Sequence, residues 1–267
     1  PSIADSNALE LYFPDDTPIK TLVLWGTAPS YSCPSSGGGA VVDLRAKGVK
    51  TVVVDPRFTP DAAKATVWLP IRPGTDVALM LAWIRYIIEN KLYDHEFVLK
   101  WTNLPFLVDT ETKMLLRDGE DFVVWDTNTN SPKRMPYPWD DSLSPAMFGT
   151  FTIGGKTYKT GFQLLWERAE PFTLQKAAEI CWVDPKKVEQ AIRLFADTPS
   201  GLAIGVATDQ TANSVQAAMA AATLDILMGN VERPGALLQR FRTSGVLKVP
   251  NYPVPVAQKM LPPEQLK

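Results

Sequence analysis

The stretch VVVDPRFTPDAAKATVWLPIRPGTDVAL runs from Val52 to Leu79 and decides the fold. Residues 52–54 are β-branched and apolar, which is typical of a strand buried on both faces of a sheet. A polar turn follows at 55–57, and the segment 66–71 predicts a second strand. A further polar turn at 72–76 precedes apolar residues at helical spacing. The stretch therefore predicts strand, turn, strand, turn and helix, in that order.

The residues before this stretch extend the same pattern. A short apolar strand is predicted at 22–25, followed by a loop rich in Gly, Ser and Pro. A helix is predicted at 40–47, and Gly48 suits the position just after its end. Strand, helix and strand in this order indicate a Rossmann-like unit with parallel strands.

The helix after the second turn has clear start and periodicity signals. Thr75 is expected at the N-cap, and Asp76 in the first turn is favoured there by the helix dipole. The apolar residues that follow at spacings of four, three and four are Val77, Leu81, Ile84 and Ile88.

The middle of the chain changes in character. The segments 106–116, 122–137 and 150–160 predict antiparallel hairpins, the last with a tight turn at Gly154-Gly155. Further elements are then predicted as helices at 161–169, 174–181 and 185–195, a short helix at 95–101, and a buried strand at 202–207. The packed face of a last helix, which ends at Gly229-Asn230, is expected to consist of Val215, Met219, Ala222 and Ile226.

These elements predict an α/β fold: a Rossmann-like parallel sheet flanked by helices, with an antiparallel β-hairpin insertion. We expect residues 1–103 to form the first half of a dinucleotide-binding domain and 104–160 to form the insertion. Residues 161–245 would complete the α/β domain with helices and the returning strand, and 246–267 would form a Pro-rich irregular tail.

The composition of the 267 residues excludes several classes of protein. With 45% hydrophobic residues the chain can bury a substantial core, and its net charge of −2 gives no basic field for nucleic acid. The sequence has no apolar run long enough to cross a membrane. It begins with Pro rather than Met, so we expect a fragment or a processed product, and any export signal would precede Pro1.

The side chains that usually perform catalysis are scarce. Cys33 and Cys181 fit no zinc or iron–sulfur spacing, and His95 is the single histidine. Free buried thiols and a surface imidazole are the expected states of these residues. We predict no metal ligand in this chain, and the sequence leaves the catalytic residues unknown. If the chain belongs to an enzyme, another part must supply the reactive centre.

Polar residues follow the predicted strands, where open parallel sheets bind ligands. Asp55 could accept hydrogen bonds from ribose hydroxyls or simply begin an Asp-Pro turn. Asp76 could pair with the two adjacent donors of guanine or only cap its helix. Arg57 and Arg72 could bind phosphate or stack on a base, or could be solvated charges. Gln210 could reach a ligand or be an ordinary turn residue.

Two longer segments together resemble the dimethyl sulfoxide reductase family, whose molybdenum or tungsten cofactor carries two pyranopterin guanine dinucleotides. The first is VVVDPRFTPDAAKATVWLPIRPGTDVALMLAWIRYIIENKLYD, and the second is GLAIGVATDQTANSVQAAMAAATLDILMGNVERPGA. The β-rich insertion resembles the branch that contains acetylene hydratase and the transhydroxylases. The chain is similar to the middle part of such an enzyme.

The resemblance implies a site for one guanine dinucleotide arm of a molybdopterin cofactor with molybdenum or tungsten. It would place residues 25–27 at the pyrophosphate, 55–57 near ribose and phosphate, and 74–76 at the guanine. Val206 and Gln210 would approach the pterin. Together with Arg72, which could bind phosphate or stack on a base, the expected cofactor-binding residues are Trp25, Gly26, Thr27, Asp55, Pro56, Arg57, Arg72, Gly74, Thr75, Asp76, Val206 and Gln210.

The resemblance also implies parts that this chain lacks. These are an N-terminal iron–sulfur cluster, the residue that ligates the metal, and a C-terminal domain over the pterins. The complete protein would be a bacterial oxidoreductase of anaerobic respiration, and its partners would be its other domains and an iron–sulfur electron-transfer subunit. The fragment alone would be inactive.

Two alternatives stay open from the residues. One is a structural or electron-transfer subunit that resembles the large subunit of respiratory complex I and has lost the pterin. The other is a plain nucleotide-binding Rossmann domain, against which the missing GxGxxG turn counts.

Overall fold

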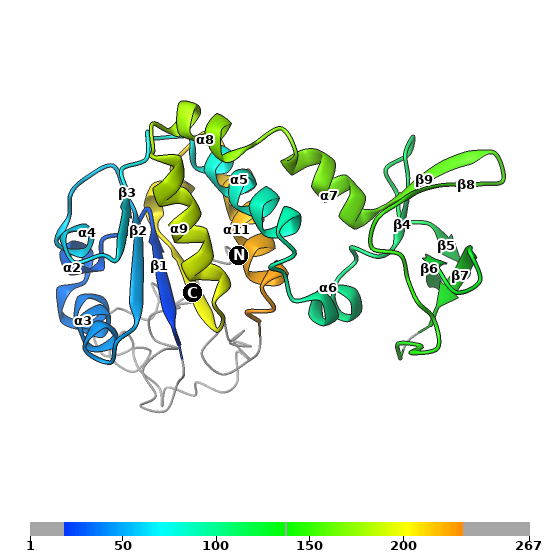
Figure 1. Cartoon of the computed structure of the whole chain (residues 1–267), viewed down its shortest axis with the longest axis horizontal. Coiled ribbons are helices and arrows are strands. Elements are labelled where there is room, and N and C mark those ends of the chain that lie inside the picture. The colour runs from blue at the N-terminus through cyan, green and yellow to red at the C-terminus, as the bar shows by residue number, and fades with distance from the viewer. Residues whose placement is uncertain (1–18, 137, 232–267) are drawn as a thin grey trace, which may run out of the picture.

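The computed structural model describes residues 19–136 and 138–231. Within these residues the chain forms one parallel sheet of four strands, helices on both of its faces, and two antiparallel sheets of three strands each (Figure 1). The α/β fold with an antiparallel β insertion is therefore confirmed. The N-terminal residues 1–18 and residues 232–267, with the predicted Pro-rich tail 246–267, lie outside the described residues, and the four predicted region boundaries stay predictions.

The parallel sheet has the strand order β10-β1-β2-β3. Its strands are β10 (Ser200–Ile204), β1 (Thr21–Trp25), β2 (Lys50–Val54) and β3 (Val67–Leu69). In the register of the sheet, Trp25 lies opposite both Ile204 and Val54, and Val54 lies opposite Leu69. The last residues of all four strands therefore meet at one edge, the carboxyl edge of the sheet.

Helices cover both faces of this sheet, as the nearly continuous burial of its strands requires. On one face Leu22, Leu24 and Val53 pack in a small core with α3 (Gly39–Ala46) and α4 (Pro60–Ala63). The short α2 (Pro29–Ser32) and η2 (Pro34–Gly38) belong to the loop on the same side (Figure 1). This face holds the smaller part of the core.

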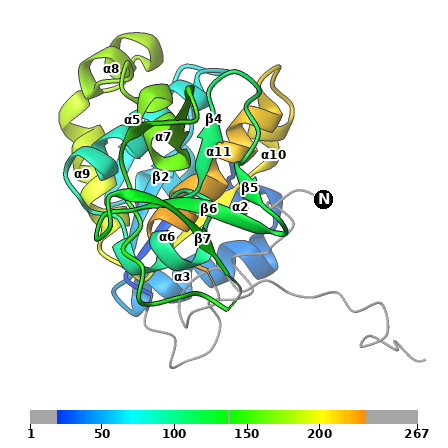
Figure 2. The same cartoon turned by 90° about the vertical axis from the view of Figure 1, so that its right-hand side faces the viewer.

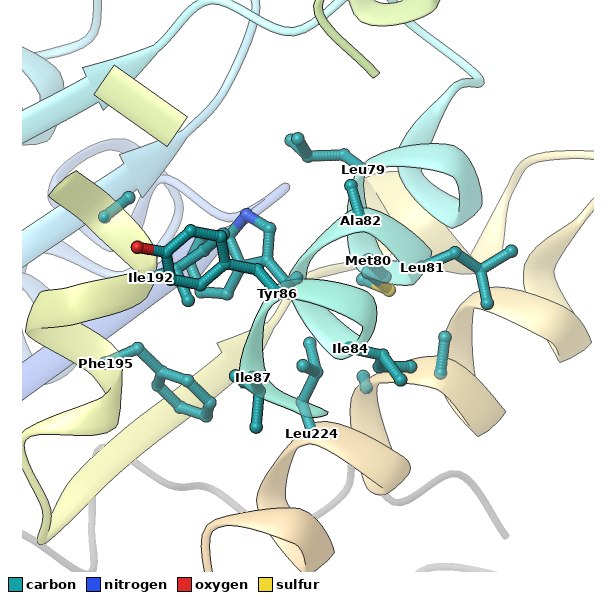
Figure 3. Close-up of a cluster of buried hydrophobic side chains, with 14 of the residues drawn as sticks. Leu79, Met80, Leu81, Ala82, Ile84, Tyr86, Ile87, Ile192, Phe195 and Leu224 are labelled. Carbon is teal, nitrogen blue, oxygen red and sulfur yellow. The ribbon is translucent and has the colours of Figure 1, made fainter. Parts of the chain in front are cut away.

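The larger core lies on the opposite face. It is built from α5 (Asp76–Glu89), α8 (Leu174–Cys181), α9 (Pro185–Ala196) and α11 (Ser214–Leu227). Helix α5 is buried almost all round, because α11, α8 and α7 (Gly161–Ala169) all pack against it. Figure 3 shows Ile87 of α5 between Phe195 of α9 and Leu224 of α11.

Helix α11 buries a different face from the predicted one. Val215 and Met219 are 65 and 67% exposed, whereas the buried side is made by Ala217, Ala220, Ala221, Leu224 and Leu227. The expected packed face was wrong because this Ala-rich helix is apolar on both sides. Small residues let α11 approach α5 closely, so packing rather than periodicity selected the buried side.

The predicted strand 202–207 is also shorter than expected. β10 ends at Ile204, and after Gly205 the chain enters the short helix α10 (Val206–Asp209). The Thr208 hydroxyl donates a hydrogen bond of 2.8 Å to the Gly205 carbonyl and closes this turn.

The insertion consists of two sheets with the orders β4-β9-β8 and β5-β6-β7, which Figure 2 shows in front of the helices. Their strands are β4 (Leu107–Asp109), β5 (Arg117–Asp118), β6 (Asp121–Asp126), β7 (Ser131–Met135), β8 (Thr150–Ile153) and β9 (Lys156–Thr160). The hairpins β6–β7 and β8–β9 form as predicted. The segment 106–116 also folds back on itself as predicted, through an antiparallel bridge between Val108 and Leu115 and a hydrogen bond of 2.7 Å from the Leu116 N–H to the Leu107 carbonyl. Its strands find further partners, because β4 also pairs with β9 and β5 with β6.

The remaining helices begin and end where the sequence predicts them, within a residue. The insertion is flanked by α6 (His95–Trp101) and α7. Asp184 caps α9 through a hydrogen bond of 2.8 Å from the Lys186 backbone N–H. None of the helices in the described ranges is long and apolar enough to span a bilayer.

Asp225 of α11 is a buried carboxyl group without compensation. It is 5% exposed, and its Oδ1 has no hydrogen-bond partner among the described residues. Burial raises the pKa of Asp225 well above its usual value, because the ionised form loses its solvation. The group is therefore neutral over a pH range in which the unfolded chain is already ionised.

This difference predicts a pH-dependent stability. Above the unfolded pKa of about 3.9 the folded state binds one proton more than the unfolded state, so the free energy of unfolding should fall as pH rises, by about 1.4 kcal/mol per unit up to the folded pKa. The free energy of unfolding of the wild type and of Asp225→Asn should be measured in urea between pH 4 and 7. The wild type should show this fall, and Asp225→Asn should not. The exposed Asp43→Asn serves as the control. Equal slopes for the wild type and Asp225→Asn would contradict the prediction.

Candidate functional site

The segments that leave three strands are joined at the carboxyl edge of the sheet. The Gly26 N–H donates to the Val54 carbonyl at 2.9 Å, and the Gly205 N–H donates to the Trp25 carbonyl at 2.8 Å. The Asp55 N–H donates to the Leu69 carbonyl at 3.2 Å. These bonds extend the sheet by one residue and bring polar segments from distant parts of the sequence side by side.

Two glycines allow the segments after β1 and β10 to approach each other. Gly26 has a positive φ of 63°, and a Cβ atom there would lie 3.2 Å from the side chains of Ala207 and Thr208. A Cβ atom at Gly205 would lie only 2.2 Å from the Gly26 carbonyl oxygen. The close passage of these two backbones therefore depends on glycine at both positions.

A hydrogen bond between Trp25 and Asp76 joins β1 to the start of α5. The indole Nε1 donates to Asp76 Oδ1 at 2.8 Å, and both side chains are buried. The fully buried Trp25 ring also packs edge-on against Trp83, with 5.3 Å between ring centroids. The Trp25 side chain is thus used inside the fold, and its backbone carbonyl accepts the Gly205 N–H.

The other oxygen of Asp76, Oδ2, receives no hydrogen bond from any described residue. A carboxylate oxygen has two acceptor positions, so Oδ1 also keeps one free after bonding Trp25. The helix dipole at the start of α5 favours the negative charge. The Trp25 indole therefore orients a carboxylate that retains acceptor capacity.

The loop before Asp76 is exposed from Arg72 to Gly74, and Gly74 has a φ of 80° with open space where a Cβ atom would be. Thr75 stands at the N-cap position, but the expected side-chain cap is wrong. Its hydroxyl instead donates a hydrogen bond of 2.7 Å to the Arg72 carbonyl and closes the loop.

The end of α8 holds this loop. The Arg72 N–H donates to the Cys181 carbonyl at 2.8 Å, and the Cys181 thiol lies 3.5 Å from the Thr75 carbonyl. Burial raises the pKa of the Cys181 thiol, so the thiol stays protonated and donates to that carbonyl. Cys181 is thus a buried thiol, as the sequence predicted, and it has a structural role here. Cys33 was also predicted to be buried but is exposed, so that prediction was wrong.

Asp55 has the role of a turn residue in this structure. It is 3% exposed, and its Oδ1 accepts the Arg57 N–H at 2.8 Å, while Arg57 Nε lies 3.6 Å from the same oxygen. The Trp68 indole donates to the Asp55 carbonyl at 2.8 Å. Pro56 and the Arg57 side chain face solvent. A role for Asp55 at a ribose stays a prediction.

Val206 and Gln210 lie on and just after α10, and both are exposed. Helix α10 packs against Gly26. It therefore lies beside Thr27 and the end of β1. The structure thus groups residues 25–27, 76 and 205–208 through direct contacts, and Asp55 follows Val54, whose carbonyl accepts the Gly26 N–H. For the Gln210 side chain it provides no hydrogen bond within the described residues.

Sequence reasoning missed Asp61, which fixes the loop after β1. Asp61 is fully buried and accepts hydrogen bonds from the Ser30 N–H at 3.1 Å and the Ser30 hydroxyl at 2.7 Å. Arg45 Nη1 lies 3.8 Å from its Oδ1. In the sequence Asp61 follows Thr59-Pro60, a normal place for an exposed acidic residue in a first helical turn, so no local signal distinguishes it.

The described residues contain no group of three or more His, Cys, Asp or Glu side chains that could hold a metal ion. The available chemistry at the carboxyl edge is hydrogen bonding and charge, from the Asp55 and Asp76 carboxylates and the exposed Arg57 and Arg72 side chains.

The parallel sheet with its covering helices defines an α/β protein of the Rossmann-like class. A family model described as molybdopterin oxidoreductase matches residues 19–262, so the chain belongs to the molybdopterin oxidoreductase family. This confirms the resemblance that the two sequence segments indicated.

Two relatives and one solved structure place the chain within larger proteins. The catalytic polypeptide of a putative dimethyl sulfoxide reductase from Halobacterium salinarum is 34% identical over 192 residues, covering 68% of this chain and 22% of that protein. The alpha subunit of dimethylsulfide dehydrogenase from Rhodovulum sulfidophilum is 28% identical over 207 residues, covering 71% and 23%. The chain therefore spans less than a quarter of either relative.

The structure of acetylene hydratase from Pelobacter acetylenicus aligns with a TM-score of 0.54 at 24% identity, covering 85% of this chain and 24% of that one. This likeness shows the shared fold. Placement in the acetylene hydratase branch stays a prediction.

The close contact between Gly205 and Gly26 predicts that one added methyl group at Gly205 lowers the stability of the fold. Gly205→Ala should destabilise the fold by about 1–3 kcal/mol, because the added Cβ would overlap the Gly26 carbonyl. Gly39→Ala at the start of α3 is the control, since no atom lies within 4 Å of its Cβ position. Chemical denaturation of both variants measures the difference. Similar stability of the two variants would show that the backbones can separate at little cost.

Proposed function

We propose that this chain holds one guanine dinucleotide arm of a molybdopterin cofactor, with molybdenum or tungsten, at the carboxyl edge of its parallel sheet. The observation that carries the proposal is the Asp76 carboxylate, oriented by Trp25 at the base of an exposed glycine loop. Guanine presents two adjacent N–H donors that a carboxylate can accept together, and adenine presents no such pair.

The residues present fit this ligand. Asp76 keeps free acceptor positions, and the open space beside Gly74 leaves room for a base next to it. A pyrophosphate would lie beside the close passage of Gly26 and Gly205, where β1 ends. Arg57, whose side chain is 69% exposed, offers a positive charge next to the buried Asp55. We therefore assign guanine to Asp76 and the Gly74 loop, the pyrophosphate to Thr27 and Gly26 next to Trp25 at the end of β1, and ribose and phosphate to residues 55–57.

The same edge would continue towards the pterin. Val206 and Gln210 on the exposed side of α10 are the residues that we assign to it, and Arg72 and Thr75 complete the guanine loop. When bound, the cofactor would supply a metal that exchanges two electrons with a substrate, and this chain would bind and orient one of its arms.

We propose that the complete protein is an oxidoreductase and that this chain alone is inactive. The metal-ligating residue and any iron–sulfur cluster would come from other parts of a longer polypeptide. Two relatives are named as subunits, which supports a partner subunit that transfers electrons. The remaining domains of the same polypeptide would be its other partners.

Nucleotide binding tests the proposal directly. Isothermal titration of the 267-residue chain should detect binding of GDP, weaker binding of IDP, which lacks the second guanine donor, and no binding of NAD. Asp76→Asn should weaken GDP by about 10- to 100-fold, in line with the roughly 1–3 kcal/mol carried by a charged paired contact.

The Asp76→Asn variant is informative because its amide oxygen can still accept the Trp25 indole. Its NH₂ group then replaces the free carboxylate oxygen and opposes the guanine donors. Asp43→Asn, an exposed carboxylate on α3, should bind GDP as the wild type does. Binding of NAD without GDP would favour a plain dinucleotide-binding domain, and unchanged GDP affinity in Asp76→Asn would remove Asp76 from the site.

A further inference from the structure

Trp182, directly after α8, combines two unusual properties. Its backbone is left-handed, with φ 60° and ψ 37°, a conformation in which Gly is normally found after a helix. Its side chain is 68% exposed. A bulky aromatic residue is costly in this conformation, and it contributes little to the core here, so the position has a feature that folding alone does not explain.

The same residue is fixed to the loop that leads to Asp76. The residue before it, Cys181, bonds the loop at Arg72 and at Thr75, as described above. The Arg72 guanidinium carbon lies 4.7 Å from the centroid of the Trp182 ring. The guanidinium and the indole therefore form a stacked pair beside the exposed Gly74, in the loop that ends at Asp76.

Stacked planar groups beside a carboxylate have a clear use in binding a purine. The faces of a base stack on aromatic rings and on guanidinium groups regardless of which base it is, whereas its edge is distinguished by hydrogen bonds. We propose that Trp182 and Arg72 form the stacking platform for the purine ring whose edge pairs with Asp76. This rests on the proposed function and adds the residue that supplies affinity rather than selectivity.

The two roles are separable by experiment. Removal of the platform should weaken all purine nucleotides by a similar factor, whereas removal of the Asp76 carboxylate should abolish the preference for guanine. Trp182→Leu should weaken both GDP and ADP by about 5- to 100-fold, the usual range for loss of one stacked base, without changing the ratio of their affinities. Trp182→Phe keeps a ring and should retain most of the affinity.

Two further variants control for indirect effects. Asn tolerates the left-handed conformation, so Trp182→Asn removes the ring with little backbone strain and should bind as Trp182→Leu does. Trp101 at the end of α6 is 76% exposed, and Trp101→Leu should bind like the wild type. Titration calorimetry with GDP and ADP on the full 267-residue chain, with circular dichroism to verify folding, provides the measurements.

The outcomes distinguish this inference from the proposed function. If Trp182→Leu and Trp182→Asn bind GDP as the wild type does, the platform is overturned while the guanine site stands. A loss of GDP affinity without loss of ADP affinity would also overturn it, because stacking does not select the base. If the wild type binds no GDP, the proposed function itself fails, and the platform fails with it.

Discussion

The hydrogen bond between the Trp25 indole and the Asp76 carboxylate connects the central strand of the sheet to the most buried helix. Each group would be costly to bury alone, since an unpaired buried donor or acceptor loses about 1–3 kcal/mol, and here each satisfies the other. Trp83 provides a contrast, because its buried indole N–H has no partner within the described residues. The Trp25 bond is thus a specific link that sets where α5 begins relative to the end of β1.

The arrangement of the candidate site follows from this link and from the sheet. Parallel strands in register end at the same edge, so the segments after β1, β2 and β10 are adjacent without further contacts. Gly26 and Gly205 then allow two of these segments to come closer than side chains would permit. Asp61 holds the loop that leaves β1 from the other face of the sheet. The geometry at the edge therefore depends partly on groups that are not assigned to the ligand, such as Gly205 and Asp61.

Local patterns in the sequence were sufficient for most elements. The β-branched run of β2, the Pro and Asp that begin α9, and the glycine turn between β8 and β9 are signals that neighbours in the sequence supply. The gathering of polar residues at one edge was also predictable, because it follows from strands being parallel. Features that depend on distant partners were not predictable. The apolar face of α11 was assigned to the wrong side because only the packing against α5 distinguishes its two faces. The segment 106–116 pairs with itself as expected, but the additional pairing of its strand β4 with β9, some fifty residues later, had no signal in the local sequence.

The position of β10 has a consequence for how the chain matures. β1 is a central strand, yet its neighbour on one side is contributed by residues 200–204, far behind β1, β2 and β3 in the order of synthesis. Until those residues have left the ribosome, nascent β1 presents an unpaired row of backbone groups and an apolar surface, which invites association with other chains. Production of this protein should therefore benefit from chaperone protection of β1 while residues 26–199 are being made.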